Sequence, residues 1–342
     1  MFVPLTILDF LRRAEQVYGA RLGVLDEPQQ PAPSLGGLTY ARIGTLARAQ
    51  AAGLDALGIG FGERVAIVSQ NSARLLVSFF GVAGHGRALV PINFRLSPAE
   101  IDHIVAHSGA SLLLVDPELD AALAGVKCAR RLVLGADSDA VLFRSDALVG
   151  SGALPEPWKP DENATATINY TSGTTARPKG VELTHRNLWV NATTFALHTG
   201  VNDRDVYLHT LPMFHCNGWG MPFALAGLGA AQVVLRKIDG MEILRRVERH
   251  GVTLMCAAPA VFNAVLTAAA TWQGPVPGRG RVRVVCAGAP PPTRTIERIE
   301  AELGWEFIQI YGLTETSPLL TINRSRAEWD GLDGHARAER LA

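Results

Sequence analysis

Residues 165–184 read TATINYTSGTTARPKGVELT, and residues 185–200 continue HRNLWVNATTFALHTG. The β-branched and apolar residues of 165–170 predict a strand. Thr184 is a good helix-capping residue, so we expect a helix from there to about residue 198, ending at Gly200. A strand, a hydroxyl-rich loop and a capped helix in this order favour an α/β protein.

The loop between this strand and this helix is a candidate phosphate site. Its glycines and hydroxyl side chains favour a turn in which successive backbone N–H groups make an anion-binding concavity. Lys179 adds a point charge for phosphate. The alternative is an ordinary Ser/Thr/Gly surface loop, and the Gly-Lys-Ser/Thr signature of GTPase P-loops is absent. The Pro-Lys-Gly at 178–180 and the flanking strand and helix favour phosphate binding.

The rest of the chain repeats the same alternation of short strands and helices. A complete helix start lies at Ser97, where Pro98 follows and Glu100 completes a capping box. Residues 149–163 are rich in Gly and Pro and predict a joint between two such regions. This rhythm predicts mostly parallel sheets covered by helices. The expected strands are 64–68, 88–92, 111–115, 232–235, 252–257, 281–287 and 306–311, and the expected helices are 72–82, 97–108, 240–250, 261–270 and 292–303.

Composition limits the class of protein. A length of 342 residues suggests roughly two domains or subdomains. Lys plus Arg and Asp plus Glu are 32 each, and this zero net charge argues against nucleic-acid binding. The most apolar stretch, 75–92, is interrupted by polar residues, so we expect no membrane span. The four cysteines form no CxxC pair and favour a reducing compartment, which we expect to be cytoplasmic.

Two further loops are expected at one edge of a sheet. The strand at 281–287 leads into Gly288, Ala289 and Pro290, and the strand at 306–311 leads into Gly312, Thr314 and Glu315. Because a strand–helix–strand unit makes these strands parallel, both loops leave the carboxyl edge, where open α/β folds bind ligands. Tyr311 offers a ring for stacking on a base, Thr314 a donor for phosphate, and Glu315 an oxygen ligand for Mg²⁺. Taken alone, Glu315 is better explained as a solvated loop carboxylate.

Residues 211–220, LPMFHCNGWG, place His215 in an otherwise apolar stretch. A histidine in such a place is more often a satisfied core residue. Cys216 is adjacent, but neighbouring side chains of an extended segment point to opposite faces, which argues against a Cys–His nucleophile pair. The chain has neither a G-x-S-x-G elbow nor a G-x-G-x-x-G loop after a strand, so a hydrolase and a dinucleotide oxidoreductase are both disfavoured.

With these motifs the sequence resembles the adenylate-forming superfamily, which includes acyl-CoA synthetases, adenylation domains and luciferases. YTSGTTARPKG at 170–180 resembles the family's phosphate loop, QIYGLTETSP at 309–318 its adenine and magnesium motif, and CAGAPPP at 286–292 its adenine-side loop. The resemblance implies a five-layer αβαβα domain with two stacked, mostly parallel sheets. It also implies an ATP-dependent activation of a fatty or aryl carboxylic acid to acyl-AMP, followed by transfer to coenzyme A.

The resemblance assigns residues by position. The catalytic set is His215, Lys179, Thr314 and Glu315, and the metal set for Mg²⁺ is Thr171 and Glu315. The implied ATP-binding set is Thr171, Ser172, Gly173, Thr174, Thr175, Lys179, Gly288, Ala289, Pro290, Gln309, Tyr311, Gly312 and Thr314. The implied acyl-substrate set is His215, Asn217, Gly218, Trp219, Met221 and Pro222.

There are two departures from the family pattern. Ala176 stands where the family usually has Gly, and we find neither the family's TGD-type segment nor its lid lysine. We therefore expect residues 1–342 to be a truncated large N-terminal domain, with an incomplete small β-barrel subdomain, no C-terminal lid and little turnover. We expect a first subdomain at about 50–200 and a second at about 1–49 and 201–322.

Other readings stay open at this point. One is an amino-acid or acyl adenylation domain that loads a carrier protein, although residues 214–217 offer no carboxylate for a substrate ammonium group. Another is a non-catalytic fragment that binds nucleotide. A homodimer is also open.

Overall fold

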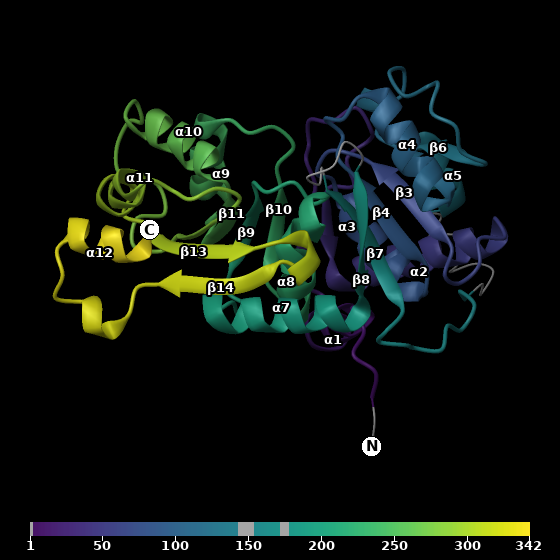
Figure 1. Cartoon of the computed structure of the whole chain (residues 1–342), viewed down its shortest axis with the longest axis horizontal. Coiled ribbons are helices and arrows are strands. Elements are labelled where there is room, and N and C mark those ends of the chain that lie inside the picture. Colours follow the sequence, from purple (N-terminus) through teal and green to yellow (C-terminus); the bar gives the residue numbers. More distant parts are fainter. Residues whose placement is uncertain (1–2, 143–153, 172–177) are drawn as a thin grey trace.

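The computed structural model describes residues 3–142, 154–171 and 178–342. The predicted phosphate-loop residues Ser172, Gly173, Thr174 and Thr175, and Ala176 with them, lie outside this description. The described strands form two open sheets (Figure 1). This α/β architecture with mostly parallel sheets is the predicted one.

The first sheet has six strands in the order β6-β5-β3-β4-β7-β8. All neighbours are parallel except β7 and β8, which form an antiparallel pair. β7 and β8 make a hairpin pair, and the residues of the predicted phosphate loop lie between them in the sequence. The strands are β3 (Arg64–Val68), β4 (Ala88–Ile92), β5 (Ala110–Val115), β6 (Arg131–Val133), β7 (Thr165–Thr171) and β8 (Lys179–Thr184).

The second sheet has eight strands in the order β14-β13-β12-β11-β9-β10-β1-β2. Its inner pairs are parallel, and an antiparallel strand lies at each edge. The strands are β1 (Leu22–Leu25), β2 (Gly37–Thr39), β9 (Val206–His209), β10 (Ala231–Val234), β11 (Leu254–Ala257), β12 (Arg283–Cys286), β13 (Glu306–Gly312) and β14 (Leu319–Arg324). The subdomain boundaries given above stay a prediction.

Alternate residues of each sheet face two different apolar clusters, which produces the five layers. In β3, Val65 and Ile67 join the central cluster, whereas Ala66 and Val68 join an outer one. In the second sheet, strand residues such as Cys256 and Ile308 face the same central cluster, and their neighbours face a third. Because side chains alternate along a strand, each sheet is covered by apolar packing on both faces.

Helices fill the central layer and the two outer layers. The central cluster contains α1 (Leu8–Tyr18), α2 (Tyr40–Ala56), α3 (Ala73–Gly81), α7 (His185–Thr199) and α8 (Met221–Leu228). The outer face of the first sheet carries α4 (Pro98–Ser108), and that of the second carries α9 (Gly240–His250), α10 (Pro259–Ala269), α11 (Thr293–Arg298) and α12 (Gly334–Leu341). The short helix α5 (Ala136–Leu142) packs beside α2. None of the described helices combines the length and apolar character needed to cross a bilayer.

The predicted helix starts at Ser97 and Thr184 are confirmed. Ser97 accepts from the backbone of Glu100, whose carboxylate accepts from the Ser97 backbone in return. Thr184 and Asn187 make the same reciprocal pair at the start of α7. Both helices end at a left-handed glycine, Gly109 and Gly200.

Six of the fourteen described strands were not predicted, namely β1, β2, β6, β8, β9 and β14. β8 follows the phosphate-loop residues in the sequence, and β14 follows the predicted adenine and magnesium motif. β14 pairs antiparallel with β13 and supplies the edge of the larger sheet. Within the described residues, neither sheet closes on itself into a barrel.

Candidate functional site

The carboxyl ends of the two sheets are tied together by buried polar side chains. Arg236, after β10, makes a bidentate ion pair with Asp116, after β5, at 2.9 and 3.1 Å. Asn71, after β3, donates its amide to the carbonyl groups of His209, Leu211 and Leu235, and it accepts from the Met213 backbone at 2.8 Å. These bonds fix the start of the segment that carries His215.

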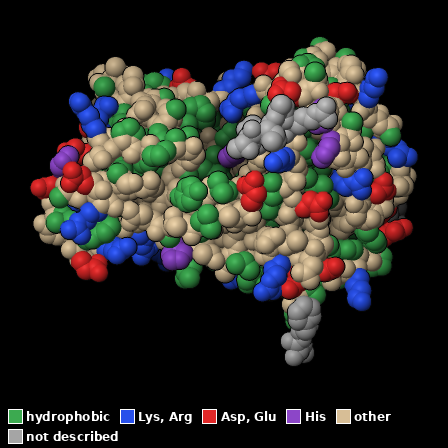
Figure 2. All heavy atoms as spheres, viewed as in Figure 1, with side chains coloured by type: hydrophobic (Ala, Val, Ile, Leu, Met, Phe, Trp, Pro, Cys, Tyr) green, Lys and Arg blue, Asp and Glu red, His purple; other side chains and the backbone are tan. Residues whose placement is uncertain are grey.

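A small crevice of about 50 Å³ lies beyond this junction. It brings together three groups that are far apart in the sequence: the His215 segment, the loop after β12, and the turn after β13. Its lining residues are His215, Cys216, Trp219, Ala287, Gly288, Ile310, Gly312, Leu313, Thr314 and Pro318. Figure 2 shows that the face viewed is hollowed between the two halves of the molecule, with acidic and basic side chains interspersed around it.

The loop after β12 is shaped to receive a flat group. Cys286 of β12 pairs with Gln309 of β13, so both strands deliver their following loops to the same edge. Gly288 has a φ of +89°, which L side chains rarely adopt, and the space beside its Cα is nearly open. Ala289 and Pro290 are exposed beside it. The ring of Tyr311, at the end of β13, is 57% exposed. These residues fit the adenine contact that the resemblance implies.

The turn η5 (Thr314–Thr316) brings the predicted metal residues to one side of the molecule. It is closed by the Thr316 hydroxyl, which donates to the Leu313 carbonyl at 2.9 Å. The turn packs against β8. In the hairpin, Lys179 at the start of β8 pairs with Thr171 at the end of β7. The hydroxyl of Thr171, the ammonium of Lys179 and the carboxylate of Glu315 are therefore carried by adjoining elements.

These residues fit Mg²⁺ held jointly with phosphate oxygens. Glu315 is exposed and offers a carboxylate, and the half-buried Thr171 offers a hydroxyl. The described residues contain no cluster of three or more His, Cys, Asp or Glu side chains that would form a metal cage by themselves. Mg²⁺ commonly binds through one or two carboxylates together with substrate phosphates, so this small set of oxygen ligands matches its chemistry.

His215 is the exposed residue of an otherwise buried segment, η3 (His215–Gly220). Partial removal of water by the surrounding groups, together with the nearby Arg95 guanidinium, lowers the pKa of the His215 imidazole. Burial, and in second place the Glu315 carboxylate, raises the pKa of the Cys216 thiol to about 12. A thiol that stays protonated is a poor nucleophile, which agrees with the rejection of a Cys–His pair.

The residues after His215 have an unusual backbone. Cys216, Asn217, Gly218 and Trp219 all have positive φ, of 42°, 55°, 57° and 60°. For residues with a Cβ this left-handed conformation costs roughly 1–2 kcal/mol each. The turn leaves the Trp219 ring in the crevice wall and directs the Asn217 side chain into the protein interior, where it is fully buried.

Several predicted ligand residues do not line the crevice. Asn217 donates its amide to the Thr167 hydroxyl at 2.8 Å. Met221 and Pro222 are buried in the first turn of α8. The Gln309 side-chain amide lies against the carbonyl groups of Leu341 and Ala342 at the end of α12. The substrate roles assigned to these residues stay predictions.

Sequence reasoning did not single out Asn71, Asn169 or Thr167. Their importance comes from contacts with residues 45 or more positions away, and a single sequence carries no local signal for such contacts.

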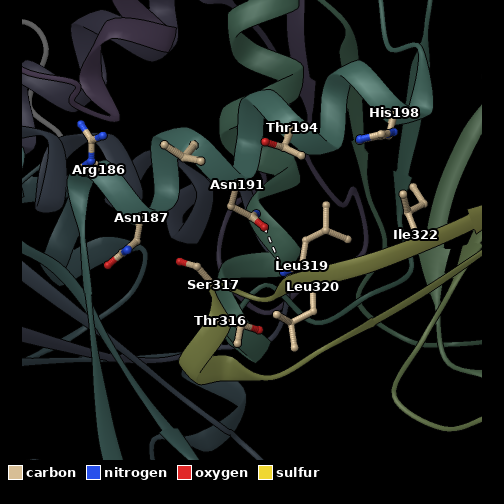
Figure 3. A pocket seen from close by; sticks show the side chains of 11 residues that line it. Arg186, Asn187, Asn191, Thr194, His198, Thr316, Ser317, Leu319, Leu320 and Ile322 are labelled. Carbon is tan, nitrogen blue, oxygen red and sulfur yellow. Dashed lines mark hydrogen bonds between the residues drawn. The ribbon is translucent and has the colours of Figure 1, made fainter.

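A second groove of about 410 Å³ lies on the other side of residues 316–319, between α7 and β14 (Figure 3). Its lining residues are Arg186, Asn187, Val190, Asn191, Thr194, His198, Thr316, Ser317, Leu319, Leu320 and Ile322. Asn191 separates the groove from the crevice. It accepts from the Leu319 backbone at 3.1 Å, the dashed line of Figure 3, and donates to the Trp219 carbonyl at 3.1 Å.

Comparison with known proteins identifies the family and the fold. The model of the family described as "AMP-binding enzyme" matches residues 25–337, which include every described loop of the crevice. The chain belongs to the AMP-binding enzyme family. The structural predictions based on resemblance to adenylate-forming enzymes are thus confirmed at the level of family and fold.

Relatives in this AMP-binding family are carboxylate–CoA ligases. 4-Hydroxybutyrate–CoA ligase 2 of Metallosphaera sedula is 36% identical over 96% of this chain and 60% of its own length. Acetate/butyrate–CoA ligase AAE7 of Arabidopsis thaliana, a peroxisomal protein, is 32% identical over 99% of this chain and 62% of its own length. The chain thus spans about three fifths of the length of these relatives.

Solved structures of the family superpose on most of the chain. The inhibitor-bound N-terminal domain of FACL13 from Mycobacterium tuberculosis has a TM-score of 0.80 at 27% identity, covering 94% of this chain and 79% of that one. A long-chain-fatty-acid-CoA ligase (FadD1) from Archaeoglobus fulgidus has a TM-score of 0.81 at 23% identity, covering 99% of this chain and 69% of that one. The latter likeness concerns the fold alone.

Proposed function

We propose that this chain carries the nucleotide- and acid-binding site of an ATP-dependent carboxylate–CoA ligase. In the first step, a carboxylate oxygen attacks the α-phosphorus of ATP, the bond to the β-phosphate oxygen breaks, and acyl-AMP and pyrophosphate form. In the second, the thiol of coenzyme A attacks the acyl carbon and releases AMP. The observation that carries the proposal is the crevice, where the adenine-side loop, the Thr314 turn and His215 meet in a member of the AMP-binding family.

The proposed roles follow the chemistry of each group. Gly288, Ala289 and Pro290 receive adenine beside the Tyr311 ring. Lys179 and the Thr171 hydroxyl neutralise and position the phosphates, and Thr314 donates to the α-phosphate. Thr171 and Glu315 would hold Mg²⁺, which neutralises phosphate charge when bound. Such positioning and charge neutralisation is how proteins promote phosphorus chemistry.

The acid is proposed to be a short aliphatic one. The crevice is small, and Trp219 and Pro318 form apolar walls beside His215. The ligases for 4-hydroxybutyrate, for acetate and butyrate, and for 2-methylpropanoate are among the similar proteins, and all are named for short acids. Coenzyme A rather than a carrier protein is the proposed acceptor, because these similar proteins are named as CoA ligases.

We also propose that the polypeptide of residues 1–342 binds nucleotide but adenylates slowly by itself. The resemblance assigns a second phosphate-contacting lysine to a lid for which we find no match in these residues. Among the described lysines, Lys179 is the one carried by the phosphate hairpin, and Lys237 is engaged with Glu118 at 3.3 Å.

A thermal-shift measurement with butanoyl-sulfamoyl adenosine, a mimic of butanoyl-AMP, tests the binding proposal. At a hundredfold excess over its dissociation constant, the mimic should add about 2.7 kcal/mol to the free energy of unfolding. Gly288→Val should abolish this gain, because the new side chain fills the adenine loop. Gly274→Val is the matched control, since Gly274 has the same φ of +89° and lies in open space. A wild-type protein that is folded yet unaffected by the mimic would refute the proposal.

A further inference from the structure

Three buried polar side chains close a ring of hydrogen bonds beneath His215. The Thr167 hydroxyl donates to Asn169 Oδ1 at 2.9 Å, Asn169 Nδ2 donates to Asn217 Oδ1 at 3.1 Å, and Asn217 Nδ2 donates to Thr167 Oγ1 at 2.8 Å. All three residues are at most 2% exposed. Asn169 Nδ2 makes one further bond, to the Phe214 carbonyl at 3.2 Å. Each amide oxygen and each amide nitrogen of the ring is therefore paired.

The ring holds the backbone on both sides of His215. The Phe214 carbonyl precedes the imidazole, and Asn217 lies within the left-handed turn that follows it. Such a backbone persists only where its surroundings fix it. The bonds from Asn169 and Thr167 provide this restraint, because they reach the turn from a different element, β7.

The same strand face leads into the phosphate loop. Since side chains alternate along a strand, Thr167, Asn169 and Thr171 project from the same face of β7. Thr171 ends the strand and is the residue to which we assign phosphate and Mg²⁺ contacts. The ring thus joins the segment that presents His215 to the strand that presents the phosphate loop.

We propose that Asn169 is a positioning residue that sets where His215 stands relative to Thr171 at the end of β7. It acts through Asn217 and the Phe214 carbonyl, and it does not touch substrate. The inference rests on the proposed function, because it assigns His215 to the acyl end of the acyl-adenylate. It predicts that losing the bonds donated by Asn169 disturbs recognition of the acyl group more than recognition of AMP.

The test compares Asn169→Leu, which keeps the branched shape of the side chain but donates no hydrogen bond, with the wild-type polypeptide of residues 1–342. Calorimetric affinities are measured for AMP and for butanoyl-sulfamoyl adenosine. We expect affinity for the mimic to fall about tenfold, as the loss of one or two buried hydrogen bonds gives, and affinity for AMP to change less than twofold. The His215 ring signals in a two-dimensional NMR spectrum should shift. They are assigned among the nine histidines by their absence in His215→Gln.

Two further variants make the result specific. Thr167→Val breaks the ring at one corner with little change in shape, and it should show the same pattern more weakly. If Asn169→Leu fails to fold, Thr167→Val tests the proposal in its place. Gln50→Ala is the matched control, because Gln50 of α2 is a buried amide outside the crevice that donates to Ser78 of α3 at 2.8 Å. It should lose stability and leave the His215 signals and both affinities unchanged.

Each outcome decides between the two proposals. If the folded wild-type protein does not bind the mimic, the proposed function fails. If it binds the mimic, but the ring variants leave the His215 signals unchanged or weaken AMP and mimic equally, Asn169 is a packing residue and the positioning role is overturned.

Discussion

The surroundings of His215 favour the neutral form of its imidazole over the charged form. Loss of water contact and the Arg95 guanidinium both lower its pKa. A neutral imidazole can donate a hydrogen bond through one ring nitrogen and accept one through the other. It can therefore orient the oxygen atoms of a bound acid without forming a strong ion pair that would hold the carboxylate back from reaction.

Replacement of His215 should affect binding more than stability. Since the side chain is exposed and no hydrogen bond to its ring is found among the described residues, His215→Ala should change the free energy of unfolding by about 0.5 kcal/mol or less. Affinity for butanoyl-sulfamoyl adenosine should fall about tenfold, as for a lost hydrogen bond to a partly charged group. Urea unfolding and calorimetry measure the two effects. His198→Ala, an exposed histidine on α7 outside the crevice, is the control. A variant that unfolds at much lower urea yet keeps its affinity would make His215 a core residue.

At the scale of elements, the ion pair between Arg236 and Asp116 joins the ends of β10 and β5, which belong to different sheets. Its side chains are 4% and 2% exposed, and Ser69 also donates to Asp116 at 3.0 Å. A buried charge that loses its partner is costly. This pair should therefore contribute to the docking of the two sheets in a way that surface pairs do not.

Arg236→Met should lower the free energy of unfolding by about 3–5 kcal/mol, because it leaves the Asp116 carboxylate buried and unpaired. The double variant with Asp116→Leu should recover most of this loss. Arg298→Met is the control, since the pair between Arg298 and Glu302 on the surface is exposed on both sides and should matter little. Urea unfolding of the wild-type protein, the single variants Arg236→Met and Asp116→Leu, and the double variant gives the coupling directly. Purely additive effects would show that the pair does not act as a unit.

The elements that the sequence predicted are those with local chemical signals. The helix after Ser97 and the helix after Thr184 begin and end at the expected residues, because a capping side chain and a left-handed glycine act within one turn. β8 and β14 were missed because each is an antiparallel strand whose residues are largely half-buried or exposed, so neither shows a continuous apolar run.

The candidate site, like the helices and strands, was predicted where the sequence carries a local signal. The loops at Gly288 and Thr314 were placed at one edge from strand order alone, and the structure brings them together. The left-handed turn at Cys216–Trp219 has no sequence signal, since Cys and Trp rarely take a positive φ and do so here under the restraint of distant residues. Asn71 and Asn169 were missed for the same reason, because their contacts are with residues far away in the sequence.

At the scale of the whole molecule, three histidines that are buried or largely shielded from water make stability depend on pH. Burial is the largest cause in each case and lowers the pKa of His85, His185 and His209 to about 4, from an ordinary value of 6.5. Between these two values the unfolded chain takes up protons that the folded chain does not. Stability conferred by the neutral rings is thus present above 6.5 and is lost as pH falls towards 4.

The free energy of unfolding should fall by up to about 4 kcal/mol for each pH unit in this window, which corresponds to three protons. Urea unfolding at several pH values between 7 and 5 measures this slope. His209→Gln should reduce the slope by about one proton, because it removes one of the three rings, whereas exposed His198→Gln should leave it unchanged. A slope near zero in the wild-type protein would show that these rings are charged or solvated in the folded state.

The parallel pairing of β1 with β10 has a consequence for synthesis on the ribosome. Val24 lies beside Gln232, and Leu25 beside Val233. At 5–20 residues per second, a ribosome needs about 10–40 seconds to reach β10 after it has made β1. The first sheet, whose strands lie between residues 64 and 184, is complete in the meantime. During that interval the apolar residues of β1 have no neighbour on the β10 side, so they stay open to chaperones that bind nascent chains until β10 has been made.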